Sequence, residues 1–305
     1  MLGTVLVPLD GSGFAEAALP IAQEIVARSG GRLCLATANQ PSAVMAGEGD
    51  ITEALAVIGE ECRLDDESYL VRTAAELGKV GAGVVRVSIV DGVPGEAICE
   101  EAVRLEADLI VMATHGRNAM DRVWLGSVAD HVVRHAGRPV LLVKPARAGG
   151  STHHQPIRNI LVPLDSSDFS EVILEPVISF ARLLRARITL LTVVAPKFGI
   201  AEPELPPPAA QHPAVVARRS DSAHLRLDRL TRLYDAIGID AKSRVAVAET
   251  PASGILGVLA EERFDMVALA THGAAGIRRL LAGSVADKVI RGSRKPVLVY
   301  HPVAP

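Results

Sequence analysis

The chain alternates short apolar runs with longer segments in which apolar residues recur at helical spacing. In the first half, we predict buried strands over residues 4–10, 32–38, 84–90, 109–112 and 139–143. Helices are predicted over about 14–29, from 51 onward, over 96–107 and after 127, the first of them ending at Gly30-Gly31. This alternation predicts a parallel sheet with helices on both faces.

The second half repeats this plan. One offset separates Gly116 from Gly273, Gly126 from Gly283 and Pro139 from Pro296. We predict strands over 160–165, 187–194, 266–269 and 296–300, a helix over about 169–185, and a later helix with an apolar face of Leu230, Leu233, Tyr234 and Ile237. The repeat predicts two domains, residues 1–147 and 157–305, joined by a linker over 148–156 and interrupted by a proline-rich loop over 196–213.

One motif stands at the same place in both halves, directly after a predicted strand. Ala113-Thr114-His115-Gly116 is followed after nine residues by Gly126-Ser127, and Ala270-Thr271-His272-Gly273 is followed after nine residues by Gly283-Ser284. Ser127 and Ser284 are expected to be the N-caps of the helices that follow. A helix N-terminus beside a glycine turn favours an anion, so each half is predicted to hold a phosphate.

The motif is similar to G-x2-G-x9-G-[S/T], the nucleotide-binding motif of the universal stress proteins, and the chain resembles a tandem pair of such domains. Alanine (Ala113 and Ala270) replaces the first glycine of the motif in both halves. The resemblance implies two doubly wound α/β domains of the flavodoxin-like, Rossmann-like class, similar to the adenine nucleotide alpha hydrolases, each with a five-stranded mostly parallel sheet. It also implies ATP as the ligand, with Mg2+ bound through the nucleotide.

The same resemblance implies the roles of particular residues. Asp10 and Asp165 would contact the adenosine, the backbone at Ala38 and Val193 would line the adenine, and the Gly-x9-Gly-Ser segment would hold the phosphates. The alternative for Asp10 is a carboxylate that forms the turn or caps the helix. The candidate nucleotide-binding residues of the first half are Pro8, Leu9, Asp10, Ala38, Gly92, Met112, Ala113, Gly116, Arg117, Gly126, Ser127 and Val128. Those of the second half are Pro163, Leu164, Asp165, Val193, Leu269, Ala270, Gly273, Gly283, Ser284 and Val285.

Two differences between the halves favour the first site as the better binder. The turn Gly92-Val93-Pro94, which the family places near the ribose, becomes Glu249-Thr250-Pro251 in the second half. Arg117, which could reach a phosphate, becomes Ala274. We therefore expect the second site to bind more weakly or to be empty.

Composition excludes several classes of function. The net charge is −3 with acidic and basic residues interspersed, which argues against a nucleic-acid or anionic membrane surface as the main partner. No run reaches the roughly 18 apolar residues that span a bilayer, and the three cysteines make a poor disulfide framework. We expect a cytoplasmic protein.

Little in the sequence points to catalysis. There is no G-x4-G-K-[S/T] segment, and neither a base, a lysine nor a metal-ligand set is repeated at the phosphate site. His115 and His272 are interpreted as structural. His131 and His135 have zinc-like spacing, but Lys288 and Gly292 replace them in the second half, so a solvated helix face is favoured. We expect no catalytic residue, no metal held by the protein itself and at most slow ATP hydrolysis.

The expected role is regulation, in which nucleotide occupancy alters a surface that an unknown protein partner reads. The fifth strands, 139–143 and 296–300, are predicted to pair, either between two chains in a homodimer or with each other as an internal pseudo-dimer. Two alternatives stay open. One is a nucleotide-free dimerisation scaffold of the same fold, and the other is a true ATPase or adenylyl-transferring enzyme.

Overall fold

The computed structural model describes residues 2–39, 51–79, 83–114, 125–145, 155–195, 213–271 and 284–302, without the side chains of residues 51–58, 168 and 284. The chain forms two compact units, the first of Met1–His154 with His301–Pro305 and the second of Gln155–Tyr300. Among the described residues, no helix is both long and apolar enough to cross a membrane.

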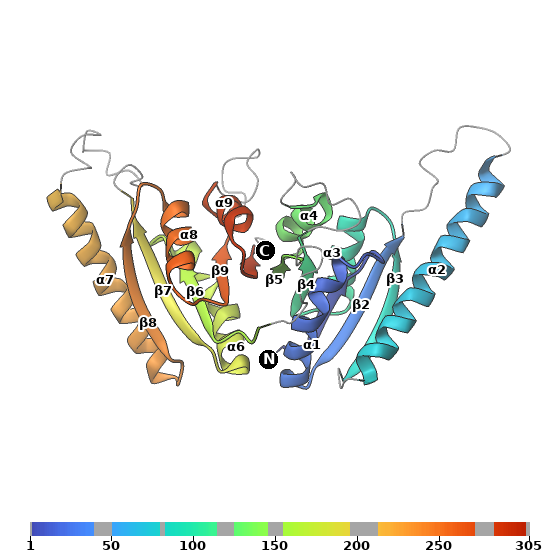
Figure 1. The fold of residues 1–305 in the computed structure, drawn as a ribbon, viewed down its shortest axis with the longest axis horizontal. Helices are drawn as coiled ribbons and strands as arrows, with labels where there is room; N and C mark the ends of the chain where they lie inside the picture. The colour runs from blue at the N-terminus through green and yellow to red at the C-terminus, as the bar shows by residue number, and fades with distance from the viewer. Residues whose placement is uncertain are drawn as a thin grey trace. The chain divides into compact units, whose positions relative to one another are not determined.

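The first unit is a parallel sheet in the order β3-β2-β1-β4-β5 (Figure 1). Its elements are, in chain order, β1 (Thr4–Pro8), the 3-10 turn η1 (Ala15–Ala18), α1 (Leu19–Ser29), β2 (Arg32–Asn39), α2 (Ile51–Lys79), β3 (Val84–Asp91), α3 (Pro94–Arg104), β4 (Leu109–Ala113), α4 (Ser127–His135) and β5 (Val140–Val143). The predicted strands are thus present, and the first predicted helix begins as a 3-10 turn.

The second unit repeats this order as β8-β7-β6-β9-β10, again with parallel pairs. Its elements are β6 (Asn159–Pro163), α5 (Asp168–Glu171), α6 (Leu174–Leu184), β7 (Arg187–Val194), α7 (Pro213–Ala236), β8 (Ala241–Val247), α8 (Pro251–Glu261), β9 (Met266–Ala270), α9 (Ser284–Gly292) and β10 (Val297–Tyr300). The expected class, two repeated doubly wound α/β domains, is confirmed.

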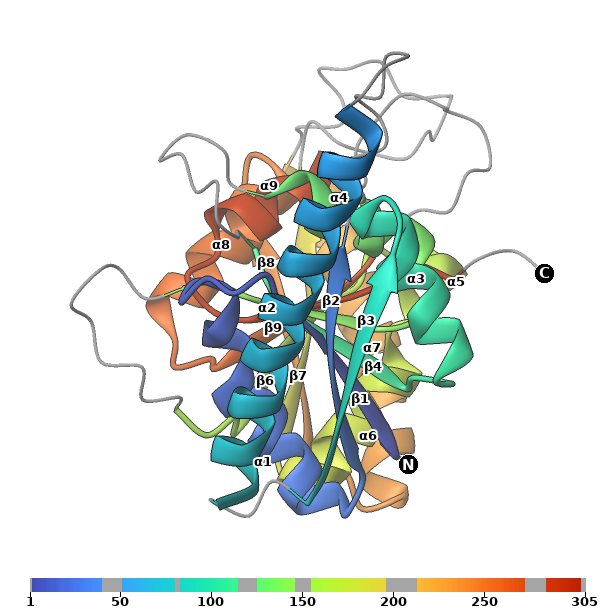
Figure 2. The ribbon, with the colours of Figure 1, turned by 90° about the vertical axis from the view of Figure 1, so that its right-hand side faces the viewer.

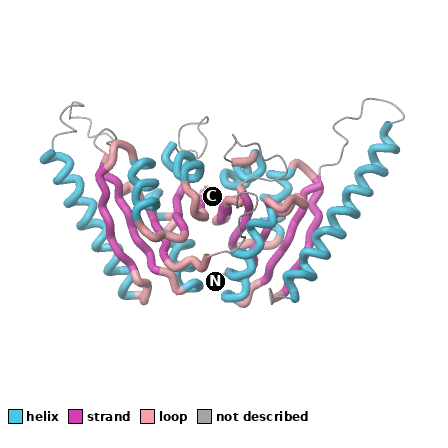
Figure 3. Tube along the Cα trace, in the orientation of Figure 1, coloured by secondary structure: helices cyan, strands magenta, loops and turns pink. Residues whose placement is uncertain are grey.

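Helices cover both faces of each sheet, as the tube view shows by colour (Figure 3). In the first unit, α1 and α2 lie on one face and α3 on the other (Figure 2), with α4 packed against α3. The reason is topological. The chain moves outward from β1 through β2 to β3 and then reverses to β4, and right-handed crossovers therefore place the later helices on the opposite face.

The core is aliphatic and is centred on the strands. Every residue of β1 and β4 is buried, and in the second unit β6 and β9 are buried except at both end residues of β6 and the last residue of β9. Phe180 of α6 is the one large aromatic among the most fully buried side chains of the described residues. Burial of both faces explains why these strands read as continuous apolar runs rather than as alternating patterns.

The predicted apolar face of α7 is partly wrong. Ala223, Leu227 and Thr231 are the buried residues of this helix, whereas Leu233 and Ile237 are 57% and 49% exposed. The buried residues recur at i, i+4 and i+8, and Leu233 lies off this stripe, while Ile237 follows Ala236, the last residue of the helix.

Candidate nucleotide site

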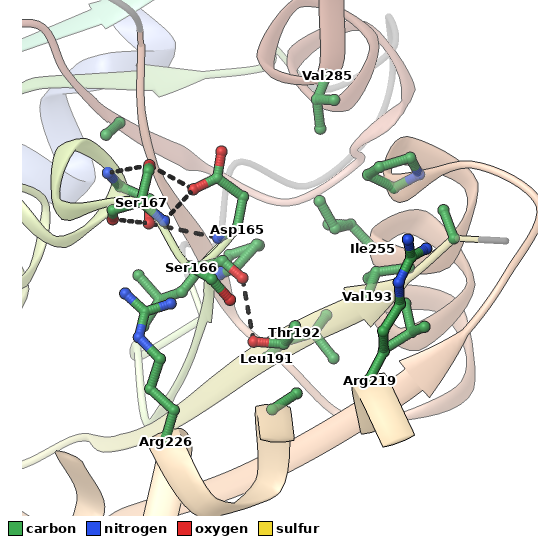
Figure 4. A pocket seen from close by; sticks show the side chains of 18 of the residues that line it. Asp165, Ser166, Ser167, Leu191, Thr192, Val193, Arg219, Arg226, Ile255 and Val285 are labelled. Carbon is green, nitrogen blue, oxygen red and sulfur yellow. Dashed lines mark hydrogen bonds between the residues drawn. The ribbon is translucent and has the colours of Figure 1, made fainter. Parts of the chain in front are cut away.

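A cavity of about 970 Å³ lies at the carboxyl ends of the strands of the second unit (Figure 4). The ends of β6, β7 and β9 line it, together with α7 and the first residues of α8 and α9. The chain order reverses between β6 and β9, and ligands of open α/β sheets bind in the crevice at such a point. Topology therefore places this cavity where a ligand is expected.

Seven of the predicted site residues of the second half line this cavity: Pro163, Leu164, Asp165, Val193, Leu269, Ala270 and Val285. Gly273 and Gly283 lie outside the described residues, and the side chain of Ser284 is also outside them. The fold thus brings residues that are far apart in the sequence to one cavity.

Asp165 sits in a tight turn directly after β6. Its Oδ1 accepts hydrogen bonds from the backbone amide of Ser167 at 3.0 Å and from the Ser167 hydroxyl at 2.5 Å. Ser166 between them has a positive φ of 73°, a conformation that L side chains adopt at a cost. The turn holds the carboxylate at the mouth of the cavity.

The first unit builds the same turn. Asp10 Oδ1 accepts from the amide and the hydroxyl of Ser12, at 3.0 and 2.5 Å, and Gly11 has the positive φ of 76°. The turn-forming alternative for Asp10 is therefore present, and it is compatible with contact to a ligand because a carboxylate can accept more than these two hydrogen bonds. In both units a buried threonine on the next strand donates to the carbonyl before the aspartate, Thr37 to Leu9 and Thr192 to Leu164, each at 3.1 Å.

The start of α4 lies beside the end of β4. The amide of Gly126 donates to the carbonyl of Thr114 at 2.8 Å, and Thr114 in turn donates to Val143 at 2.9 Å. The first bond ties the residue before Ser127 and Val128 to the residue after Met112 and Ala113, and the first amides of α4 have no acceptor within the helix. Pro8, Leu9 and Asp10 end β1 in the same unit, Ala38 lies near the end of β2, and Gly92 follows β3; Gly116 and Arg117 lie outside the described residues.

The predicted helix caps are wrong by one residue. Gly126, with the extended backbone of an N-cap, precedes α4, and Ser127 is its first helical residue. Likewise α9 begins at Ser284 itself. Both glycine and serine are favourable N-cap residues, so the sequence preference did not separate the two positions. The helix N-terminus stays at the Gly-Ser pair in either case.

The universal stress protein family model matches this chain twice, over residues 1–144 and 156–301. The chain belongs to the universal stress protein family. Universal stress protein Rv2005c of Mycobacterium tuberculosis is 30% identical over 241 residues, which cover 77% of each chain. A Thermus aquaticus universal stress protein is 35% identical over 144 residues, 47% of this chain and all of that protein.

A solved structure supports the tandem fold of this family member. The universal stress protein of Archaeoglobus fulgidus superposes with a TM-score of 0.73 at 18% identity, covering 99% of this chain and 100% of that chain. At that identity the likeness concerns the fold alone.

One wall of the cavity in the second unit of this universal stress protein is positively charged. We did not predict this wall from the sequence. Arg218, Arg219 and Arg226 of α7 line the cavity, and they outnumber the one lining carboxylate, Asp165. Arg226 is paired with Glu171 of α5 at 2.6 Å. The spacing of Arg219, Ser222, Ala223 and Arg226 at i, i+3, i+4 and i+7 was the available signal, since it puts them on one helix face.

The carboxylate that we expected to weaken the second site does not line the cavity. Glu249, which replaces the family's glycine, is exposed and is not one of the residues that line the cavity. Thr250 instead caps α8, accepting a hydrogen bond from the amide of Ser253 at 3.1 Å. Arg117 and Ala274 lie outside the described residues, so the stronger first site stays a prediction.

His131 and His135 stack on each other on α4, with ring centroids 4.2 Å apart. Gly95 of α3 packs so closely on His131 that an added Cβ would lie 2.7 Å from the histidine Cβ. Burial and the neighbouring His135 lower the pKa of His131. His131 therefore packs between α3 and α4, whereas the predicted solvated face describes only the exposed His135.

Proposed function

We propose that this universal stress protein binds adenine nucleotide, with ATP as the ligand, and acts by regulation rather than by catalysis. The observation that carries the proposal is the cavity of about 970 Å³ at the carboxyl ends of β6, β7 and β9. Its volume falls in the range of roughly 300–1,000 Å³ that is usual for small-molecule sites.

The lining of the cavity fits the parts of a nucleotide. Leu191, Val193, Ile255 and Leu269 offer an apolar slot for a base, and Asp165 offers a carboxylate for ribose hydroxyls. Val285 lies in the first turn of α9, where backbone amides and the helix dipole favour phosphates. Mg2+ would be held by these phosphates.

The same lining argues against fast hydrolysis of ATP. Among the described lining residues, Asp165 is the one carboxylate, and histidine and lysine are absent from that set. The Asp165 Oδ1 is engaged in the turn with Ser167. Fast phosphoryl transfer needs a group that positions water and groups that neutralise the leaving phosphate. We therefore infer that occupancy, not turnover, is the output.

The test measures nucleotide content and rebinding. The protein is purified without added nucleotide, bound ligand is released with acid and identified by chromatography, and ATP is titrated into the emptied wild type. We expect adenine nucleotide in the released fraction and heat on titration. Absence of both, up to millimolar ATP, would refute the proposal and favour a nucleotide-free scaffold. ATP turnover faster than about 1 per second would instead favour an enzyme.

A further inference from the structure

The two units differ in charge on the helix that follows their second strand. This helix is α7 in the second unit and α2 in the first. Two contacts show which positions of these helices correspond. Arg226 of α7 pairs with Glu171 at 2.6 Å, while Tyr69 of α2 donates its hydroxyl to Glu16 at 2.9 Å.

The residue after each of these positions is fully buried, Leu227 in α7 and Leu70 in α2. Both partner carboxylates, Glu171 and Glu16, lie in the short helical segment that follows the first strand of their unit. The two helices are therefore in register at Arg226 and Tyr69.

With this register, the cavity-lining positions of α7 have acidic or neutral counterparts in α2. Arg218, Arg219, Ser222 and Ala223 correspond to Glu61, Cys62, Asp65 and Asp66. One wall thus carries guanidinium groups in the second unit, and the corresponding helix carries carboxylates in the first. A second anion would be attracted to α7 and repelled by α2.

Arg219 is the residue of this wall that is best placed to meet a ligand. Figure 4 shows it on one side of the cavity, near Val193 and Ile255, with Asp165 on another side. Arg226 already has Glu171 as its partner. The small residues Ser222 and Ala223 lie on the same helix face between the two arginines and leave room there.

The cavity is large for a small-molecule site, since about 970 Å³ is near the upper end of the usual range of roughly 300–1,000 Å³. If the 5′-phosphate of a nucleotide bound at the start of α9, the arginines of α7 would face another group of the ligand. From the size of the cavity and the charge of this wall, we propose that the second unit selects a nucleotide with a second phosphate, apart from its 5′-phosphate, and that Arg219 binds this second phosphate. The inference rests on the proposed function, because it assumes that a nucleotide occupies this cavity.

The experiment compares adenosine 5′-monophosphate with adenosine 3′,5′-bisphosphate by calorimetric titration of the full chain. A Gly126→Val, Ser127→Glu background disables the first phosphate site, so that the heat reports the second unit. We expect the bisphosphate to bind roughly 10-fold more tightly, since a hydrogen bond between ionised groups contributes strongly. Arg219→Gln should remove that preference and leave the affinity for the monophosphate nearly unchanged.

The matched control is Arg229→Gln, an exposed arginine of the same helix that does not line the cavity. It removes the same charge and should preserve the preference. Equal affinities for the two ligands in the parent protein, or a preference that survives Arg219→Gln, would overturn the inference while the proposed function stands. If the monophosphate, the bisphosphate and ATP all failed to bind, the inference and the proposed function would both be refuted.

Discussion

Gly254 of α8 packs against the wall of the cavity, and a single methyl group there tests that packing. A Cβ at this position would lie 2.5 Å from Cγ1 and 3.0 Å from Cγ2 of Val193, and 3.0 Å from the Cβ of Ala248. Val193 is a half-buried residue of β7, and its branched side chain has few rotamers by which it could move away. Gly254→Ala therefore forces α8 or β7 to shift.

The expected magnitude combines two effects of opposite sign. Overpacking a close contact costs about 1–3 kcal/mol, and alanine gains about 1 kcal/mol over glycine inside a helix. The control is Gly257→Ala on the same helix, where an added Cβ meets nothing within 4 Å. The control should gain the helix term alone, so the free energy of unfolding of the two variants should differ by about 1–3 kcal/mol.

Urea unfolding of the full chain, followed by circular dichroism, measures this difference. Because Val193 also lines the cavity, ATP affinity should fall in Gly254→Ala and stay unchanged in Gly257→Ala. If Gly254→Ala stabilised the protein as much as Gly257→Ala does, the packing of α8 on Val193 would be wrong.

Two further predictions concern stability. Arg185 ends α6 with a φ of 53°, whereas Gly30 ends α1 with a φ of 66°. Arg185→Gly should therefore raise the free energy of unfolding by roughly 0.5–1 kcal/mol and with it the melting temperature. An unchanged or lower melting temperature would contradict strain at Arg185. The carboxylate of Glu101 is 1% exposed and accepts two hydrogen bonds from Arg104, both at 2.6 Å, which lower the pKa of Glu101. A lowered pKa in the folded state gives stability that is present above the unfolded pKa and lost as the pH falls through the folded pKa. Glu101→Gln should therefore cost about 2 kcal/mol in urea unfolding at pH 7 and progressively less at lower pH, whereas a pH-independent cost would refute the ion pair as its source.

The strands and their parallel pairing could be predicted because helices cover both faces of each sheet. Burial on both faces makes runs such as Leu109–Met112 continuously apolar, and the alternation with helices then determines a parallel sheet. The repeated motif likewise located the start of α4 and α9 to within one residue, since glycine and serine mark a helix start for related reasons.

For the arginines of α7, the spacing in the sequence indicates a shared helix face but not what that face contacts. Whether Arg219 faces solvent or a cavity depends on how α7 lies against β7, and a polar helix face reads identically in both cases. Two aspartates that bind backbone amides at the amino ends of the sheets were also not predicted, because their partners are distant in the sequence. Asp108 accepts from the amides of Gly3 and Thr4, and Asp265 does so from Arg158 and Asn159, across more than a hundred residues of chain in each case.

The most direct test of the account asks whether the second cavity itself binds nucleotide. ATP is titrated into the Gly126→Val, Ser127→Glu protein and into the same protein with Ser222→Trp added, which places an indole into the cavity from an exposed position of α7. We predict binding of one ATP per chain in the first protein and loss of that binding in the second, with Arg229→Trp as a control that still binds. Absence of ATP binding in the first protein, or binding that persists with Ser222→Trp, would contradict the assignment of this cavity as a nucleotide site.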